Sequence, residues 1–123
     1  MPQRPQHLRL RLLFGKAIAL GPGKAELLQH IAAHGSISAA ARQMGMSYRR
    51  AWLLVDTMNR CFSVPLIETS TGGSGGGGAQ VTPMGEQVLA LYRQIEVKSN
   101  AAVSDELREL EGLLATLPPE DPH

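Results

Sequence analysis

Apolar residues recur at helical spacing in two segments of the first half of the chain. In residues 24–34, KAELLQHIAAH, one stripe is formed by Ala25, Leu28, Ile31 and Ala32. Gly35 then ends the pattern, as glycine does at many helix ends. In residues 48–62 a second stripe, with spacings of four, three and four, is formed by Ala51, Val55, Met58 and Phe62. This arrangement predicts two amphipathic helices, the second exposing Arg49, Arg50, Leu53, Asp56 and Arg60 and leaving Trp52 ambiguous.

The segment between these stripes has the residues that begin and separate helices. Residues 35–60 read GSISAAARQMGMSYRRAWLLVDTMNR. We expect Ser38 to cap a short helix over residues 39–44, because a serine hydroxyl accepts from an N–H group that a helix start leaves unpaired. Gly45 then supplies a turn, and Ser47 caps the longer helix. The pattern is typical of a helix-turn-helix.

The first turn of the longer helix indicates what this motif binds. Tyr48, Arg49 and Arg50 place an aromatic donor and two guanidinium groups where side chains of a recognition helix meet base edges. Either arginine is a candidate for a bidentate contact with guanine. The sequence therefore indicates nucleic-acid binding.

A strand before the helices and a hairpin after them are expected. Residues 7–14, HLRLRLLF, alternate leucine with arginine and predict a half-buried strand with a basic outer face, followed by a turn at residues 21–23. Residues 65–69 and 80–82 predict two short strands that form a hairpin with a glycine-rich tip. The tip lacks the Lys-Ser or Lys-Thr pair of a phosphate-binding P-loop. As a wing it suits DNA, because glycine lets backbone N–H groups approach phosphates.

The last third of the chain predicts a long helix. Thr82 is the expected cap, Pro83 the first helical residue, and Glu86 lies in the first turn, where the helix dipole favours it. A continuous helix over residues 83–116 would be about 50 Å long, which implies a partner helix. A break at Ser99-Asn100, with both pieces packed on one protomer, is the alternative. The apolar positions assigned to dimerisation are Val88, Leu91, Ile95, Val103, Leu107, Leu110 and Leu114.

Charge is distributed unevenly, although the 123-residue chain has a net charge of only +1. Residues 1–60 hold nine Lys or Arg against two acids, whereas residues 61–123 hold three against nine. A DNA-facing module joined to an acidic, self-associating tail would show this asymmetry, and chance clustering on solvated faces is the alternative. With one cysteine and no run of about 18 apolar residues, we expect a cytoplasmic protein without a membrane segment.

Catalytic and metal sites are not expected. No nucleophile with a base and no paired-carboxylate cleft is evident, since most acids lie along the last helix. His30 and His34 have a spacing that can hold a metal from one helix face, but no third ligand is near. We interpret them as two partly exposed histidines near a helix end.

The segments GSISAAARQMGMSYRRAWLLVDTMNR and ETSTGGSGGGGAQVTPMGEQVLALY closely resemble the amino-terminal domain of the ModE family of molybdate-dependent transcriptional regulators. The resemblance covers roughly residues 8–95, and a more distant one links GSISAAARQMGMS to LysR-type regulators. It implies a winged helix-turn-helix with the recognition helix in the major groove, Arg42 on phosphate and the wing beside the backbone. The DNA-contacting residues so assigned are Ser38, Arg42, Ser47, Tyr48, Arg49, Arg50, Thr71, Gly72, Gly73, Ser74, Gly75 and Gly76. The family often has a basic residue where this chain has Ser74.

The resemblance stops short of the family's sensor. Full-length ModE regulators continue into small β-barrel domains that bind molybdate or tungstate, and nothing after Pro118 remains to build them. The chain is either a natural single-domain form or a shortened piece of a longer regulator, and from the methionine start and the TLPPEDPH tail we expect the former. We therefore expect no cofactor, and a response to molybdate or tungstate would need another pocket.

Together these patterns predict a mainly α protein with a small β-wing: a winged helix-turn-helix followed by a long carboxy-terminal dimerisation helix. The expected parts are a flexible amino terminus (1–7), the DNA-binding domain (8–82), the dimerisation helix (83–117) and a flexible tail (118–123). The expected function is sequence-specific binding of double-stranded DNA by a homodimer on an inverted-repeat operator with half-sites about 34 Å apart. The alternative is a winged-helix module that binds other proteins and not DNA.

Overall fold

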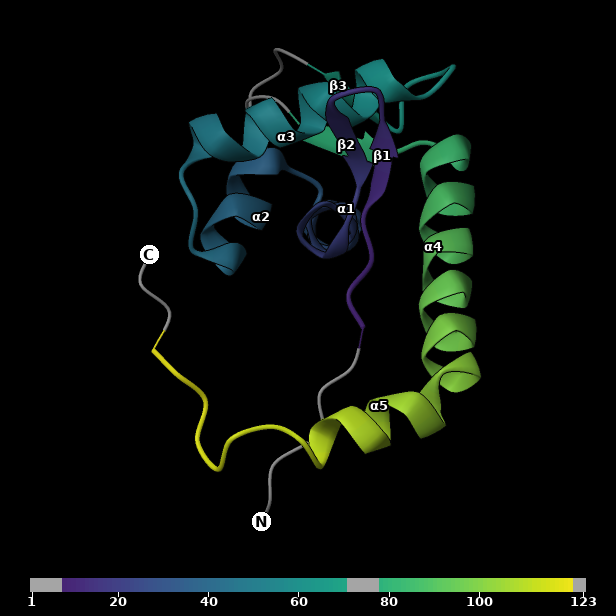
Figure 1. Ribbon diagram of the computed structural model, residues 1–123. Helices are drawn as coiled ribbons and strands as arrows, with labels where there is room; N and C mark the ends of the chain where they lie inside the picture. The colour runs from purple at the N-terminus through teal and green to yellow at the C-terminus, as the bar shows by residue number, and fades with distance from the viewer. Residues whose placement is uncertain (1–7, 71–77, 121–123) are drawn as a thin grey trace.

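The computed structural model describes residues 8–70 and 78–120. The helices α1 (Pro22–His34), α2 (Ile37–Met44) and α3 (Tyr48–Cys61) pack on one another. They carry the hairpin of β3 (Ile67–Ser70) and β4 (Gly78–Val81), and α4 (Pro83–Ala102) runs along one side of this group to α5 (Ser104–Glu111) (Figure 1). This confirms the predicted class, a mainly α winged helix-turn-helix with a small β-wing, although the long carboxy-terminal helix that was expected is divided into α4 and α5. In chain order the elements are β1 (Leu12–Phe14), β2 (Ala17–Leu20), α1 (Pro22–His34), α2 (Ile37–Met44), α3 (Tyr48–Cys61), β3 (Ile67–Ser70), β4 (Gly78–Val81), α4 (Pro83–Ala102) and α5 (Ser104–Glu111).

The core lies between α1, α3 and the base of the wing. Its largest fully buried side chains are Leu27, Leu28, Ile31, Met58, Leu66 and Ile67. The stripe predicted for α1 is confirmed at Ala25, Leu28 and Ile31 but is wrong at Ala32, which is exposed, and it omits Leu27. The buried arc of α1 differs because α2, α3, α4 and β4 all contact this helix.

The helix-turn-helix is confirmed, with one correction at its start. The hydroxyl of Ser36, not of Ser38, caps α2 and accepts from the Ala39 N–H at 3.0 Å. The helix begins earlier than predicted because Ile37 is buried in the core and already belongs to the first turn. Gly45 ends α2 with φ 68°, in the left-handed region that glycine adopts without strain. Ser47 caps α3 as predicted and accepts from the Arg50 N–H at 3.1 Å.

The strand predicted over residues 7–14 is wrong in extent. β1 begins at Leu12, its three residues are exposed, and it pairs antiparallel with β2. The predicted turn at residues 21–23 is also wrong, since Gly21 precedes α1 and Pro22 is its first residue. Pro22 suits that position because it has no N–H to leave unpaired.

Residues 8–11 form an arm that lies against α4 and not in a sheet. The Leu8 N–H donates to Oδ1 of Asn100 at 2.8 Å, and the hydroxyl of Tyr92 donates to the Leu10 carbonyl at 2.6 Å. Side chains of α4 therefore take the backbone groups that a longer strand would have paired. The predicted alternation is still seen in the exposure of the side chains, because Leu8 and Leu10 are half-buried whereas Arg9 and Arg11 are exposed.

The wing is confirmed where the structure describes it. Ile67 pairs with Val81 and Ser70 with Gly78 across the antiparallel β3–β4 hairpin. Its tip, which includes the predicted contacts Thr71 to Gly76, lies outside the described residues. Asn59 fastens the wing to α3: its Oδ1 accepts from Leu66 N and Ile67 N at 2.8 and 3.1 Å, and its Nδ2 donates to the Ile67 carbonyl at 3.0 Å.

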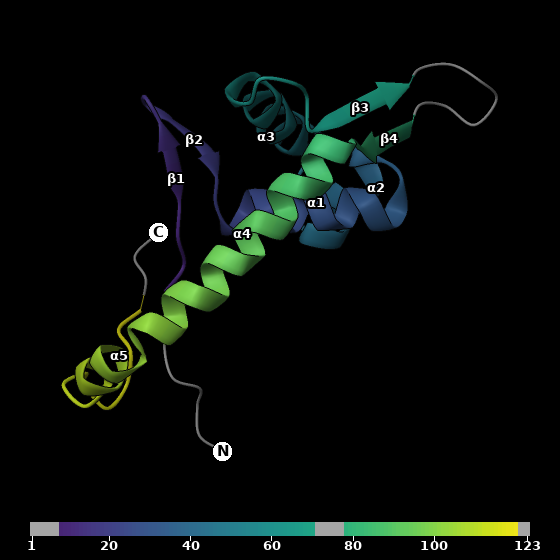
Figure 2. The same ribbon diagram turned by 90° about the vertical axis from the view of Figure 1, so that its right-hand side faces the viewer.

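The carboxy-terminal helix is interrupted, one of the two arrangements that the sequence left open. Thr82 and Pro83 begin α4 as predicted. The break comes at Val103, with φ −115° and ψ 20°, and not at Ser99-Asn100. Asn100 lies within α4, where its side-chain Nδ2 donates to the Glu96 carbonyl one turn earlier and its Oδ1 accepts from the Leu8 N–H. Figure 2 shows α5 turning away from the end of α4, and the predicted heptad positions therefore do not share one helix face.

Candidate nucleic-acid interface

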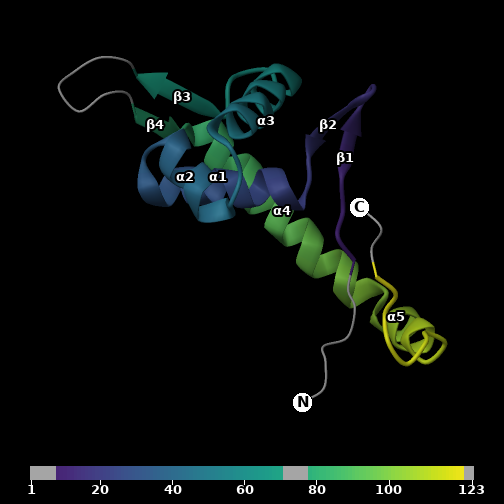
Figure 3. The ribbon, with the colours of Figure 1, turned by 90° about the vertical axis from the view of Figure 1, so that its left-hand side faces the viewer.

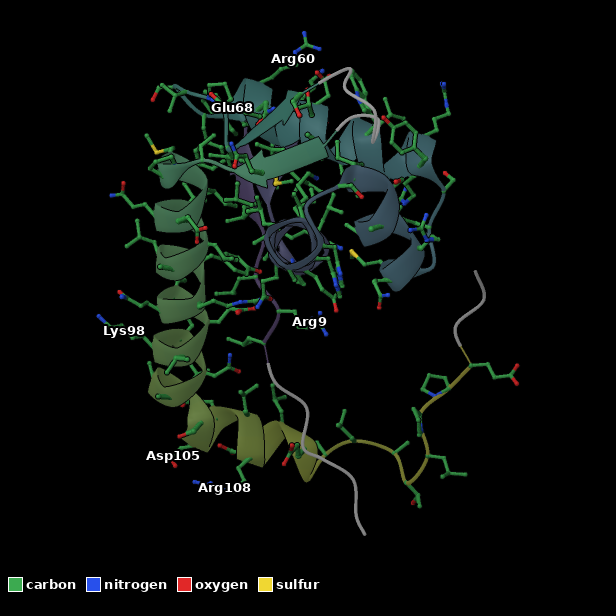
Figure 4. The ribbon with its side chains drawn as sticks, turned by 180° about the vertical axis from the view of Figure 1, so that it is seen from behind. Arg9, Arg60, Glu68, Lys98, Asp105 and Arg108 are labelled. Carbon is green, nitrogen blue, oxygen red and sulfur yellow. The ribbon has the colours of Figure 1, made fainter. Side chains whose placement is uncertain are left out.

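The solvent-facing ridge of α3 lies opposite its buried face. Successive residues of an α-helix are about 100° apart around the axis, so the buried face of Ala51, Val55 and Met58 determines which residues face outward. The outward ridge consists of Arg49, Leu53, Asp56 and Arg60. Arg60 extends away from the body of the molecule (Figure 4) and pairs only loosely with Asp56, at 3.5 Å. Arg49 is the exposed cation at the start of this ridge, and it makes no salt bridge to any residue in the ranges 8–70 and 78–120.

One flank of α3 forms a hydroxyl-lined cleft with α2 and the wing. A cavity of about 350 Å³ is bordered by side chains from all three, among them Ser36, Ser38, Tyr48, Trp52, Thr69 and Ser70. Tyr48 is 55% exposed and does not pack into the core. The structure therefore brings the predicted residues Ser38 and Tyr48 together beside the base of the wing.

Sequence reasoning missed Ser36, Trp52, Thr69 and Ser70 as part of this cleft. Trp52 was identifiable in principle, because it follows Tyr48 by four residues and so lies one turn along the same flank. The other three are brought in by the fold, since the start of α2 and the base of the wing meet only in the tertiary structure.

Arg50 lies on the opposite flank of α3. It lines a second cavity, of about 600 Å³, together with Arg9, Arg11 and Lys24. The two arginines that are adjacent in sequence therefore have different surroundings: Arg49 lies on the open ridge, and Arg50 lies in a cationic pocket.

Lys24 is the half-buried cation of this pocket. Burial is the main cause that lowers its pKa from the ordinary lysine value. The nearby Cys61 acts in the opposite direction, while Arg50 and Arg11 lower the pKa of Lys24 further.

Within residues 8–70 and 78–120, the other predicted contacts are Arg42 and Ser47, and both are exposed. Arg42 is exposed on α2, four residues after Ser38, so the two lie on the same side of that helix. Ser47 is also exposed, and its hydroxyl is already used as the cap of α3.

The two histidines stack on each other along α1, with ring centroids 5.8 Å apart. Among the residues that the structure describes, no cluster of three or more His, Cys, Asp or Glu side chains could hold a metal ion. No helix in the described ranges 8–70 and 78–120 is long and apolar enough to cross a membrane.

Comparison with curated proteins identifies several relatives. The chain is 38% identical over 112 residues to the molybdenum-pterin-binding protein MopA of Rhodobacter capsulatus, and this match covers 91% of this chain and 41% of the relative. It is also 38% identical over 112 residues to the DNA-binding transcriptional dual regulator ModE of Escherichia coli K12, covering 88% of this chain and 43% of the relative. Over 77 residues it is 46% identical to the molybdenum-pterin-binding protein MopB of Rhodobacter capsulatus, covering 63% of this chain and 28% of the relative. The chain thus spans less than half the length of these relatives.

The sequence model for bacterial regulatory helix-turn-helix proteins of the LysR family matches residues 23–86. This match runs from the first turn of α1 through the helix-turn-helix and the wing to the first turn of α4, which is the unit that the fold presents around α3. The chain therefore belongs to the LysR family of bacterial regulatory helix-turn-helix proteins.

Proposed function

We propose that the chain is a sequence-specific DNA-binding transcriptional regulator of ModE type that acts as a homodimer on an inverted-repeat operator. The observation that carries this proposal is the exposed ridge of α3, which begins with Arg49 and is flanked by the wing. A major groove about 12 Å wide admits a helix of this kind. Its amino-terminal residues are then the ones nearest the base edges.

The roles of the interface residues follow from their positions. Arg49 reads a guanine through its O6 and N7 atoms, since a guanidinium fork matches these two acceptors. Arg42 and the hydroxyl groups of the hydroxyl-lined cleft between α2, α3 and the wing contact phosphates, and these contacts set the register of the protein on the duplex. The MopA and MopB relatives are named for binding molybdenum-pterin. With the ModE resemblance, this supports our proposal that the target genes serve molybdate or tungstate transport or molybdoenzymes.

Selection of operator sequences from random DNA tests this function. We expect enrichment of an inverted repeat with half-sites about one helical turn apart, the spacing that a symmetric dimer requires. The same selection with molybdate shows whether the oxyanion changes recognition. Absence of binding to any duplex at low ionic strength would contradict the proposal and favour the protein-binding alternative.

The homodimer is proposed to form through an apolar surface between β1 and α4. Leu12, Leu91 and Ile95 border a cavity of about 340 Å³ and are each about half exposed. Leu13 and Phe14 of β1 are also exposed. A contiguous apolar patch of this kind marks an interaction surface, and a second copy of the chain can cover it through the same residues.

The other predicted dimerisation residues have a mixed placement. Val88 packs against the core, and Val103 lies at the break between α4 and α5. Leu107 is half-buried and Leu110 exposed on α5, whereas Leu114 follows that helix. The strongest candidates from the predicted set are therefore Leu91 and Ile95.

Replacing Leu91 and Ile95 together with glutamate is expected to weaken the dimer by about a hundredfold or more. Each charge occurs twice across a two-fold axis, and like charges brought together at an interface cost several kcal/mol. Light scattering across a concentration series measures the change. The control is Val97→Glu, an exposed apolar residue on a different face of α4. If the double variant stays as dimeric as this control, the interface lies elsewhere.

A further inference from the structure

The cationic pocket on the flank of α3 is formed by three segments that are distant in sequence. The arm contributes Arg9 and Arg11, the beginning of α1 contributes Lys24, and α3 contributes Arg50. No Asp or Glu of the described chain lines this cavity. None of the four cations takes part in a salt bridge between residues that the structure describes.

The fold holds these like charges together. Gly21 lets the arm pass close to the beginning of α1, because a Cβ there would lie 3.2 Å from Cγ of Arg11 and 3.8 Å from the Leu10 carbonyl oxygen. The hydrogen bonds from Leu8 to Asn100 and from Tyr92 to Leu10 fix the arm on α4 on either side of Arg9. Figure 4 shows Arg9 on this arm. The cations are thus held by backbone anchors and not by acidic partners.

The lowered pKa of Lys24 shows the electrostatic cost of this arrangement. Burial disfavours its ammonium form, and Arg50 and Arg11 add repulsion, while Cys61 acts in the opposite direction without reversing the lowered pKa. A bound anion would offset both effects, because an opposite charge at close range favours the protonated amine and raises its pKa.

The position of the pocket indicates where the anion comes from. A helix with its side chains is about 10–12 Å wide, so it fills a major groove of about 12 Å and the two phosphate strands pass along its flanks. Figures 2 and 3 show the β1–β2 hairpin on one side of α3 and the wing on the other. Arg50 and its cationic neighbours lie on the flank away from the wing.

We propose that this pocket binds a phosphate group of the DNA backbone, on the strand opposite to the one that the wing contacts. The proposal rests on the proposed function and deepens it. Arg50 then positions the protein on the duplex and does not read a base, so the two neighbouring arginines of α3 have separate tasks. Arg9, Arg11 and Lys24 surround the same phosphate with positive charge.

Lys24→Gln and Arg50→Gln test the pocket, with Lys98→Gln as the matched control on the exposed surface of α4. Each pocket variant is expected to bind about tenfold more weakly, to the selected operator and to an unrelated duplex alike. The slope of log affinity against log salt concentration should fall by about one for each substitution. Thermal denaturation of Lys24→Gln should show no loss of stability, because the charge removed is one that burial disfavours.

Two results would overturn the assignment. A loss confined to the operator would make Arg50 a base reader, and unchanged affinity with an unchanged salt slope would remove the pocket from the DNA interface. Inorganic phosphate distinguishes the source of the anion. The pKa of Lys24 is followed by NMR in the absence of DNA while inorganic phosphate is added. If phosphate raises this pKa and the variants nevertheless bind DNA with wild-type affinity, the pocket binds a free anion and the backbone assignment is wrong.

Failure of the proposed function is distinguishable from failure of this inference. If the wild-type protein binds no duplex, the regulator function fails on its own, and so does the assignment to backbone phosphate. The phosphate titration of Lys24 then decides whether the pocket binds anions at all. A titration without effect would overturn the anion site itself.

Discussion

Gly85→Ala is expected to lower the free energy of unfolding by about 3 kcal/mol. A Cβ at this position would lie 2.4 Å from the Leu66 carbonyl oxygen and 2.6 Å from Cγ1 of Val81. The carbonyl cannot move away freely, because it accepts from the Thr82 N–H at 2.9 Å. Overpacking of a tight contact typically costs about 1–3 kcal/mol, and a fixed backbone atom places this site at the upper end.

Chemical denaturation followed by circular dichroism measures the effect, with Gly23→Ala as the control. Gly23 lies in the first turn of α1, and a Cβ there meets nothing within 4 Å. The control should be neutral or more stable by up to about 1 kcal/mol, since alanine loses less conformational freedom in a helix than glycine. If the two alanine variants are equally stable, the close approach of α4 to the wing does not constrain position 85.

Arg49→Ala is expected to reduce discrimination between the selected operator and unrelated DNA by about ten- to a hundredfold. A bidentate arginine–guanine pair contributes about 1–3 kcal/mol to discrimination against the wrong base. Arg49 is the cation that begins the exposed ridge of α3, and among the described residues it makes no salt bridge. Competition binding with both duplexes at a fixed salt concentration measures the ratio of affinities.

The comparison with Arg50→Gln makes this test specific to position. Both variants lose one positive charge from adjacent residues of one helix, so charge loss alone should weaken binding to both duplexes in either variant, and only loss of a base contact should lower the affinity ratio. We expect the affinity ratio to fall for Arg49→Ala and to stay constant for Arg50→Gln. A constant ratio in both variants would show that neither arginine reads a base, and recognition would then depend on other residues of the interface.

Features that depend on neighbours within one or two turns were predictable from the sequence. The cap formed by Ser47, the left-handed turn at Gly45 and the Thr82-Pro83 start of α4 each involve groups no more than four residues apart. The buried stripe of α3 followed from its 3.6-residue period. Since the recognition helix is defined by these short-range features, the helix-turn-helix and its exposed arginines could be identified from the order of the amino acids alone.

Some features were not predictable because long-range contacts decide them. Ser36 and Ser38 are equally good caps by residue type, and the burial of Ile37 selected the first. Burial of Leu27 in place of Ala32 depends on which elements surround α1. Residues 8–11 had a strand pattern, yet Tyr92 and Asn100 of α4 bind their backbone.

The sequence by itself determined the fold class, the recognition helix and the polar character of its exposed face, because helix periodicity and capping operate within a few residues. Only the tertiary structure decided that the two adjacent arginines face different surroundings and that Arg9, Arg11, Lys24 and Arg50 share one cavity. It also decided that the last helix breaks at Val103. The physical reason is the same in each case: charges and apolar surfaces from segments far apart in the chain come together only when the core has packed.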